Sequence, residues 1–560
     1  EAGSRAKAPL TPTFETLPSC LIGPGDSGKS TVLSAVEWAF WPRYNLGVGD
    51  VDFYKCDTSQ PIVIAASVSG FPDELLKESK FALYQRGLPL DGGGFGEDDD
   101  PKDGRRVLTV RLTIGSDLEP SWEVIKNNRE PKRIGASDRA MIPVCVVGSG
   151  AGKDTTWGRH SLLQRYATSN SAMKSTSIEA LRRLSTLELS DLDAATAELP
   201  KQVESFGVNV SGDSFVNRFL MTGAQLPSQA GLFDGDAPLA LLGTGSRRLF
   251  SIAMGFRLSQ NGSLVLVDEI ESGLEPHRLC NLIQLLRAMG SDVHSHVIFT
   301  THSPVALREM QSDELYAFHC LGGIAQSHPL ASDDNEISND VQAQLRKSAE
   351  SFLAKRVVVC EGSTEVGVLR AIDCSIREKD DYGITAAGVA PSDAGGGKNM
   401  FKYARHFKDA GYDVCIFMDS DKPYEDDKKA MRDNGISVFD CDEGLFLEQQ
   451  VFTDVDFEGV RELLYYVEKK IGKQRVGDQL RCQGLHLDEI FAPGQDGLTL
   501  VLRQRLGKIA GEKGWFKSVT GGEILGTIAL KHLRVNEGPD GNTTLANHFA
   551  GISRWAIGQD

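Results

Sequence analysis

The chain has 560 residues, of which 41% are hydrophobic and 24% are charged. These values lie near the average of soluble globular proteins, so they exclude a mainly disordered, collagen-like or disulfide-dense chain. The 60 basic and 77 acidic residues give a formal net charge of −17. Nucleic-acid binding would therefore need a local basic groove or bound metal ions, because the overall charge opposes it.

The composition also bears on the compartment. No apolar run approaches the roughly 18 residues that a membrane-spanning helix needs. Residues 1–20 lack the apolar core of a signal peptide. The ten cysteines are scattered and form no CxxC pair, which is typical of buried thiols in a reducing compartment. We expect a cytoplasmic protein with no membrane partner.

The first element in the chain is a strand, loop and helix over residues 19–40. Its loop, residues 23–30, matches the pattern G-x-x-x-x-G-K-[ST], in which backbone N–H groups and the helix N-terminus bind phosphates. Lys29 is expected to reach the β- and γ-phosphates, and the Ser30 hydroxyl to ligate Mg²⁺. A glycine-rich turn arising by chance is the weaker interpretation. The expected ATP–Mg²⁺ site comprises Gly23, Gly25, Asp26, Ser27, Gly28, Lys29, Ser30 and Thr31.

The next segments differ in their periodicity. Residues 61–71 and 105–115 alternate like antiparallel strands, and residues 91–104 form an acidic surface insertion. Residues 160–205 have helical periodicity. We therefore expect residues 1–159 to be the first part of an ATPase head. Residues 160–235 are expected to be a helical insertion that serves as a dimer or docking surface.

Two apolar runs, at residues 263–269 and 296–303, are each followed by a helical stretch, as in a parallel sheet covered by helices. The first run delivers Asp268 to the Mg²⁺ shell and Glu269 to the attacking water. An ordinary strand capped by acids is the alternative. Residues 236–330 would complete the head.

The order of motifs resembles that of ABC-type ATPases, with a Walker B strand ending at Asp268, a D-loop at residues 272–276 and an H-switch at His302. This resemblance implies that His302 contacts the γ-phosphate. It also makes Gln60 a candidate Q-loop residue, although a plain surface glutamine is the alternative.

Residues 241–256 occupy the position of the signature motif in that family, although they depart from its Ser-Gly-Gly pattern. At the N-terminus of a helix, backbone and hydroxyl groups of this segment would reach the ATP of a second copy. The residues concerned are Gly243, Gly245 and Ser246.

A second α/β unit follows a polar linker at residues 331–354. Strands are expected at 355–362 and 411–421, within a core that extends to residue 455. Residues 456–560 are predicted to be mostly helical. The fold class is therefore α/β: an ATPase head with a helical insertion, a Rossmann-like second domain and a helical C-terminal segment.

Four carboxylates converge at the strand ends of this second unit. Glu361 closes one strand and Glu365 lies one helical turn later, while Asp419 and Asp421 end another strand. Ligands of doubly wound sheets gather at the carboxyl ends of strands. Acids so close together repel unless a cation neutralises them, and oxygen-only ligation favours Mg²⁺ or Mn²⁺. Solvated strand ends are the alternative for each pair.

Together, the EGSTE and MDSD segments resemble a TOPRIM domain, the catalytic fold of topoisomerases, primases and some nucleases. The resemblance implies that Glu448, or less favourably Asp442, completes a second metal site, and that Lys517 stabilises the scissile phosphate. Read without a family, Lys517 is an ordinary surface lysine. Separately, the glycine-rich turn before Lys398 and Asn399 is a candidate DNA-backbone contact or a flexible loop.

An ABC-type ATPase followed by TOPRIM resembles the OLD (overcoming lysogenization defect) family nucleases, which include the Gabija-type subunit of antiphage systems. This implies DNA cleavage with two divalent ions per site, regulation by the ATPase, homodimers or tetramers, and a UvrD-like helicase or reverse-transcriptase partner. The alternatives are an SMC- or RecF-like DNA-repair ATPase with a non-catalytic TOPRIM domain, and a topoisomerase- or primase-like enzyme.

Overall fold

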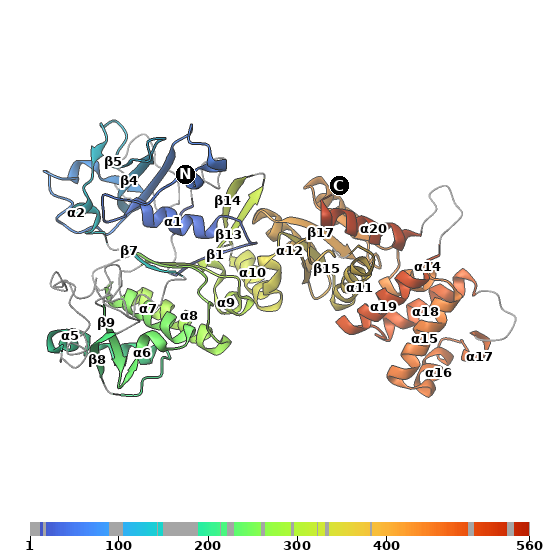
Figure 1. The fold of residues 1–560 in the computed structure, drawn as a ribbon. Coiled ribbons are helices and arrows are strands. Elements are labelled where there is room, and N and C mark those ends of the chain that lie inside the picture. The colour runs from blue at the N-terminus through green and yellow to red at the C-terminus, as the bar shows by residue number, and fades with distance from the viewer. Residues whose placement is uncertain are drawn as a thin grey trace. The chain divides into compact units, whose positions relative to one another are not determined.

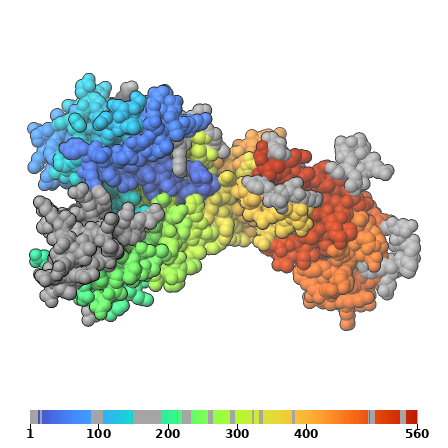
Figure 2. All heavy atoms as spheres, in the orientation of Figure 1, coloured from blue at the N-terminus to red at the C-terminus, as the bar shows by residue number. Residues whose placement is uncertain are grey.

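The computed structural model describes residues 12–14, 18–88, 105–142, 144–148, 189–212, 214–220, 229–258, 264–292, 296–321, 323–330, 335–380, 383–490, 498–534 and 543–558. The chain divides into two compact units, Glu1–Ala331 and Ser332–Asp560 (Figures 1 and 2). Within the described part of the chain, no helix is both long and apolar enough to cross a bilayer.

Unit 1 is built on a six-stranded sheet with the order β14-β13-β1-β12-β11-β7. All neighbouring strands are parallel except β13 and β14, which confirms the predicted parallel sheet. In register, Leu21 pairs with Thr300 and Val267 with Phe299, so three strands end at the same edge. The strands are β1 (Ser19–Ile22), β7 (Val144–Val147), β11 (Leu264–Val267), β12 (His296–Thr300), β13 (Leu315–Leu321) and β14 (Ile324–Pro329).

Helices cover this sheet and close its core. Leu21, Val32, Leu266 and Ile298 are buried together, so α1 packs directly on the strand that precedes its own loop. This packing fixes the phosphate loop at the carboxyl edge of the sheet. The helices of this part are α1 (Lys29–Ala39), α7 (Thr244–Leu258), α8 (Pro276–Asp292) and α9 (Pro304–Glu309).

A second, antiparallel sheet confirms the alternating pattern of residues 61–71 and 105–115. Strand β4 pairs with both β2 and β5, and Val110 and Trp122 are buried beneath it with Phe40 of the α1 C-terminus. Its elements are β2 (Ile62–Val68), β3 (Arg86–Leu88), β4 (Arg105–Ile114), β5 (Pro120–Ile125) and β6 (Lys132–Arg133), followed by α2 (Ala136–Arg139).

The predicted helical insertion is helical only in part. Residues 151–188, which include most of the expected helices, lie outside the described residues. From residue 189 on, the described part of the segment forms two helices and then strands, because Phe215 and Asn217 alternate with more exposed neighbours as in a half-buried strand. The elements are α5 (Ser190–Thr196), α6 (Leu199–Ser205), β8 (Phe215–Leu220), β9 (Gln229–Asp234) and β10 (Ala237–Pro238).

Unit 2 contains a four-stranded parallel sheet with the order β16-β15-β17-β18. Strand β15 comes first in the chain, and its neighbours β16 and β17 lie on opposite sides of it. The strand order therefore switches beside the carboxyl end of β15, where α/β sheets bind ligands. The strands are β15 (Arg356–Cys360), β16 (Val389–Asp393), β17 (Asp413–Met418) and β18 (Ser437–Asp440), with helices α11 (Ser363–Asp380), α12 (Asn399–Asp409) and α13 (Glu425–Asp433).

The segment expected to be a polar linker, residues 331–354, is instead largely ordered into unit 2. It forms α10 (Asn335–Lys347) and a short 3-10 helix (Ala349–Leu353). Val341 and Leu345 are buried one helical turn apart, which explains why a polar sequence is nevertheless helical.

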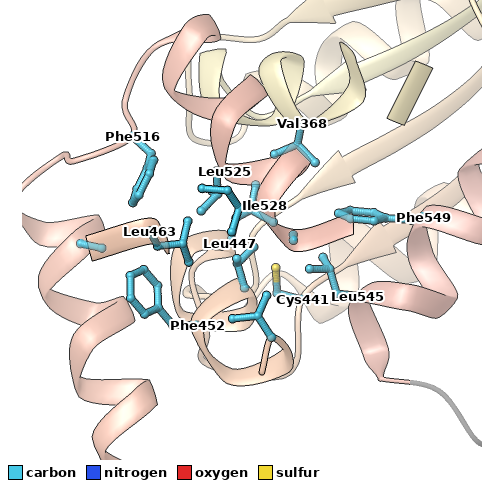
Figure 3. Close-up of a cluster of buried hydrophobic side chains, with 14 of the residues drawn as sticks. Val368, Cys441, Leu447, Phe452, Leu463, Phe516, Leu525, Ile528, Leu545 and Phe549 are labelled. Atoms are coloured by element: carbon cyan, nitrogen blue, oxygen red, sulfur yellow. The ribbon is translucent and has the colours of Figure 1, made fainter. Parts of the chain in front are cut away.

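The C-terminal segment is helical, as predicted. In Figure 3, Val368 of α11, Leu447 of α14 and Leu525 of α19 meet in one core that also contains Phe549 of α20. This core joins the sheet to the C-terminal helices. They are α14 (Leu447–Asp454), α15 (Phe457–Ile471), α16 (Lys473–Arg481), α17 (Leu487–Ile490), α18 (Leu500–Glu512), α19 (Val519–His532) and α20 (Thr544–Ile557).

Candidate active sites: a nucleotide site and a carboxylate cluster

The glycine-rich loop runs from the end of β1 to the start of α1. Gly23 has a φ of 127° and packs so closely on β13 that a Cβ there would lie 2.3 Å from the Phe318 carbonyl oxygen. A side chain at residue 23 would therefore displace the loop from the sheet. Gly28 also has a positive φ, of 96°, directly before the helix.

Lys29 is folded back into this loop. Its Nζ donates hydrogen bonds to the carbonyl oxygens of Gly23 (3.0 Å) and Pro24 (2.6 Å) and to Ser27 Oγ (3.1 Å). Burial lowers the pKa of Lys29 from its ordinary 10.5 to about 8. The loop thus holds an ammonium group where phosphates of a bound nucleotide would take over its hydrogen bonds.

The strand ends bring the predicted magnesium residues together. Ser30 Oγ donates to Asp268 Oδ1 at 2.9 Å, although the two residues are 238 positions apart. Thr300 Oγ1 donates to the same oxygen at 2.7 Å and accepts from the Glu269 backbone N–H at 2.7 Å. Thr300, which the sequence did not single out, therefore positions both acids.

Glu269 has an unusual backbone and an exposed side chain. Its φ of 50° lies in the left-handed region, which costs a non-glycine residue energy and often occurs at functional sites. The side chain is exposed beside Asp268, as expected of a residue that faces an attacking water.

Glu271 is a second residue that the sequence did not reveal. Its carboxylate accepts hydrogen bonds from Thr301 Oγ1 and from the backbone N–H of His302, both at 2.7 Å. Burial and the nearby Lys29 lower the pKa of His302. His302 is thus placed at the same sheet edge as Lys29 and Asp268.

The signature-like residues lie at the start of α7, where they pack on the D-loop of the same chain. A Cβ on Gly245 would lie 2.2 Å from the Gly273 carbonyl oxygen, and Arg278 donates to Ser246 Oγ at 3.3 Å. Gly243 has open space around its Cα. Contact with the ATP of a second copy stays a prediction.

Gln60 lies just before a strand of the antiparallel sheet. It is exposed in the turn before β2, an element of the antiparallel sheet and not of the sheet that carries the phosphate loop. Its assignment as a Q-loop residue stays a prediction.

The carboxylate cluster lies at the strand switch of unit 2. Carboxylate oxygens of Glu361, Asp419 and Asp421 all lie within 4.8 Å of one another. Glu361 follows β15 and Asp419 follows β17, and the Asp419 N–H donates to Glu361 Oε2 at 3.2 Å. The sheet thus brings together carboxylates that are 58 residues apart.

Two buried glutamates extend this cluster on the side of the helices. Glu365 in the first turn of α11 and Glu448 in the first turn of α14 are each only 5% exposed. Burial raises the pKa of Glu365 and Asp419, and the negative charge of Glu448 raises both further. Backbone N–H groups partly compensate: Gly362 donates to Glu365 (2.8 Å) and Leu447 to Asp419 (2.6 Å).

Lys517 is an exposed residue of the loop between α18 and α19. Burial raises the pKa of Glu448, and the positive charge of Lys517 opposes that rise, so the lysine lies within electrostatic reach of the cluster. The cluster fits a divalent cation, because its three closely spaced carboxylates supply only oxygen donors. Burial and the neighbouring negative charges disfavour the ionised form of Asp419, which a cation would stabilise.

Asp442, the weaker candidate for a metal ligand, is engaged in hydrogen bonds with two helices, and its role as a ligand stays a prediction. Its carboxylate accepts from Gln450 Nε2 (3.0 Å) and Thr544 Oγ1 (2.8 Å), and its N–H donates to Gln450 Oε1 (2.8 Å). Asp442 therefore ties β18 to α14 and α20.

Of the two residues proposed to contact DNA, Lys398 and Asn399, the lysine already pairs with another side chain. Lys398 pairs with Asp427 at 2.9 Å and lies over the Tyr424 ring, while Asn399 is exposed at the start of α12. Its role in DNA binding stays a prediction.

Family models match both units. Residues 195–308 match "AAA domain, putative AbiEii toxin, Type IV TA system". Residues 352–421 match "Overcoming lysogenization defect protein-like, TOPRIM domain". The chain thus carries an AAA-type ATPase domain followed by an OLD-like TOPRIM domain. This confirms the predicted pairing of domains and the fold class, an α/β chain with an ATPase head, a TOPRIM domain and C-terminal helices.

Among solved structures, the chain is similar to SMC heads. The SMC head domain from Thermotoga maritima shares 14% identity at a TM-score of 0.31, covering 59% of this chain and 97% of that one. The Smc head domain with an extended coiled coil from Pyrococcus furiosus, bound to the C-terminal domain of ScpA, shares 13% identity at a TM-score of 0.35. The match covers 60% of this chain and 94% of that one. No curated protein matches the chain in sequence.

Proposed function

We propose that the protein is a nucleotide-regulated DNA endonuclease that depends on Mg²⁺ or Mn²⁺ and nicks or cleaves DNA. The observation that carries the proposal is the carboxylate cluster: oxygens of Glu361, Asp419 and Asp421 lie within 4.8 Å of one another. Glu365 and Glu448 are buried beside them, and the charge of Lys517 reaches Glu448.

The residues have distinct tasks in phosphodiester hydrolysis. Glu361, Asp419 and Asp421, with the buried Glu365 and Glu448, would hold two divalent ions per site, the number that the family resemblance implies. Bound divalent cations would neutralise the phosphate and acidify a water molecule. Lys517, which is exposed and cationic, would stabilise charge on the scissile phosphate or the leaving oxygen.

The ATPase head would regulate this site. Lys29, Ser30, Asp268 and Glu269 would bind and hydrolyse ATP–Mg²⁺, which the hydrogen bond from Ser30 to Asp268 supports. The family resemblance supports coupling between hydrolysis and cleavage. The same resemblance supports a cytoplasmic antiphage role, a homodimer or tetramer, and a UvrD-like helicase or reverse-transcriptase partner.

A plasmid-nicking assay tests the proposal. The full chain is incubated with supercoiled plasmid and Mg²⁺ or Mn²⁺, with and without ATP. We expect wild-type cleavage, loss of at least about 100-fold in Asp419→Ala and Lys517→Ala, and altered ATP dependence in Lys29→Ala. An inert wild type under every condition would overturn the enzyme proposal, and equal activity with and without ATP would overturn the coupling.

A DNA-repair ATPase with a non-catalytic TOPRIM domain is the alternative. The clustered carboxylates argue against it, because a domain used only for docking has no need to bury repelling acids. Calorimetry with Mn²⁺ separates the two: no Mn²⁺ binding that depends on Asp419 would favour the alternative. Incorporation of nucleotides on single-stranded DNA would instead indicate a primase-like enzyme.

A further inference from the structure

The C-terminal helices carry a basic segment in a chain that is acidic overall. Residues 469–475, at the junction of α15 and α16, contain Lys469, Lys470, Lys473 and Arg475 and no acidic residue. We call this segment the basic turn. Gly472, with a φ of 92°, ends α15 and allows the chain to reverse there.

The basic turn abuts the loop that carries Lys517. Lys470 Nζ donates to the Trp515 carbonyl oxygen at 2.8 Å, and the Tyr466 ring stacks on Phe516 with centroids 5.8 Å apart. Trp515 Nε1 donates to Gln479 of α16 at 2.7 Å. Because Trp515 and Phe516 are buried, these contacts fix the basic turn against the Lys517 loop.

An exposed aromatic side chain borders the basic turn. Tyr465 is 57% exposed, and Lys469 Nζ lies 4.6 Å from the centre of its ring. Arg461 is also exposed and lies one turn earlier on α15, so cationic and aromatic groups alternate along this helix face. Figure 1 shows α15 and α16 together with α18 among the C-terminal helices.

The charges of the basic turn are largely free to meet a ligand. Among the described residues, none of Lys469, Lys473 and Arg475 forms an ion pair. All three are exposed. Cations along a surface with an exposed ring fit a polyphosphate backbone whose unpaired bases stack on the ring.

We propose that the basic turn and Tyr465 form a nucleic-acid-binding surface that continues from Lys517 and holds a DNA strand beside the carboxylate cluster. The inference rests on the proposed function and specifies where its substrate binds. It would give a chain with a net charge of −17 a local group of cations beside the loop that carries Lys517.

Binding is tested separately from cleavage. Fluorescence anisotropy measures the affinity of the full chain for labelled single-stranded and duplex DNA over a range of salt concentrations, without divalent metal. The test variant is Lys469→Ala with Lys473→Ala. The control is Lys355→Ala with Arg405→Ala, which removes the same charge from two exposed residues; Lys355 precedes β15 at the end opposite Glu361.

We expect the test variant to bind DNA at least about tenfold more weakly than the control, with a salt slope reduced by about 1.5. Tyr465→Ala should weaken single-stranded binding about tenfold, and more than duplex binding, whereas Tyr465→Phe should retain it. Equal affinity of test and control variants, at matched thermal stability, would overturn the inference. The inference would also be overturned if the test variant lost affinity for phosphatidylserine vesicles as strongly as for DNA, because the basic turn would then bind anionic surfaces in general.

A small diester, bis(p-nitrophenyl) phosphate, distinguishes failure of this inference from failure of the proposed function. Its Mn²⁺-dependent hydrolysis should survive in the test variant, because a small substrate needs only the cluster. If wild type hydrolyses neither the diester nor DNA while its DNA binding still depends on the basic turn, the proposed function fails and the binding surface stands. If the test variant lost both diester hydrolysis and DNA binding, the basic turn would not be a binding surface separate from the carboxylate cluster, and the inference would be overturned.

Discussion

Gly522 of α19 packs directly on Thr364 of α11: a Cβ at residue 522 would lie 2.1 Å from the Thr364 carbonyl oxygen. Thr364 precedes the cluster residue Glu365, and α19 begins just after Lys517 with Ser518 as its N-cap. The close crossing of these two helices therefore sets the distance between a buried carboxylate and the proposed catalytic lysine.

This crossing predicts that replacing Gly522 with alanine lowers the free energy of unfolding, which is opposite to the usual effect in a helix. A glycine-to-alanine change within a helix normally stabilises by about 0.5–1 kcal/mol. Gly522→Ala should instead destabilise by about 1–3 kcal/mol, because the added methyl group forces α19 from α11. Urea denaturation measures the effect, and nicking activity should fall while ATP hydrolysis persists.

Gly477→Ala in α16 is the matched control, because its nearest neighbour would be Leu487 Cδ1 at an ordinary 3.7 Å. It should be neutral or stabilising. A stabilised Gly522→Ala with full nicking activity would contradict the role of the crossing.

A similar comparison tests the packing of α7 on the D-loop. Gly245→Ala should lower ATP hydrolysis about tenfold or more, because the methyl group displaces Gly273 and with it the segment after Glu269. An added Cβ on Gly243 would meet no atom within 4 Å, so Gly243→Ala should leave ATP hydrolysis by a single chain near the wild-type rate. A steady-state ATPase assay decides. Equal losses in both variants would favour direct contact of this segment with a nucleotide.

The sequence predicts parts of each site to different degrees. The alternation of strands and helices predicts that Asp268 lies near Ser30 and Asp419 near Glu361, because parallel strands end at one edge of the sheet. It could not supply Thr300, Glu271 or the Gly522 crossing. Those depend on side-chain packing between segments far apart in the chain, and a glycine pair in a sequence reads as a turn although here it opens a helix.

The cluster also predicts that replacing one of its carboxylates raises the stability of the metal-free protein and weakens metal binding. Asp419→Asn removes one of several repelling buried charges and retains an oxygen that can accept from the Leu447 N–H. We expect the metal-free variant to be more stable than wild type by about 1–2 kcal/mol. Thermal melts with and without Mn²⁺ check this: Mn²⁺ should raise the wild-type Tm and leave the variant nearly unchanged.

Asp421→Asn is the comparison, since Asp421 belongs to the same group of three carboxylates, whereas Asp419 is the one on which Glu365, Glu361 and Glu448 all act electrostatically. It should stabilise less in the absence of metal. A destabilised Asp419→Asn would show that its carboxylate serves the fold and not a cation.

Asp393 links α10 to the cluster and is expected to position Glu361. Its Oδ1 accepts from Lys347 Nζ (2.9 Å) and from the Gly395 N–H (2.8 Å), and the next residue, Gly396, donates to the Glu361 carbonyl oxygen at 2.7 Å. Asp393→Asn should weaken Mn²⁺ binding about tenfold, as changes around a metal ligand do. Titration calorimetry measures the affinity.

Lys347→Met should act in the same direction, because it frees Asp393 and the following turn. Lys402→Met is its control: Lys402 is equally exposed and pairs with two other residues, Glu336 and Asp340, at 3.1 and 3.3 Å. Both changes should leave the free energy of unfolding close to that of wild type, as expected for exposed ion pairs. Equal Mn²⁺ affinity in the two variants would contradict the link.

Lys29 predicts proton uptake when ATP binds. With its pKa lowered by burial to about 8, part of the Lys29 population is neutral at about pH 8.5 in the nucleotide-free protein. Phosphate oxygens favour the charged form and so raise this pKa, which means that binding draws protons from the buffer. Calorimetry in two buffers of different ionisation enthalpy should give a positive proton count at about pH 8.5 and a smaller one at about pH 7. Lys29→Arg keeps the charge without titrating in this range, so any residual ATP binding should take up no proton. Uptake that persists in Lys29→Arg would assign the proton to another group.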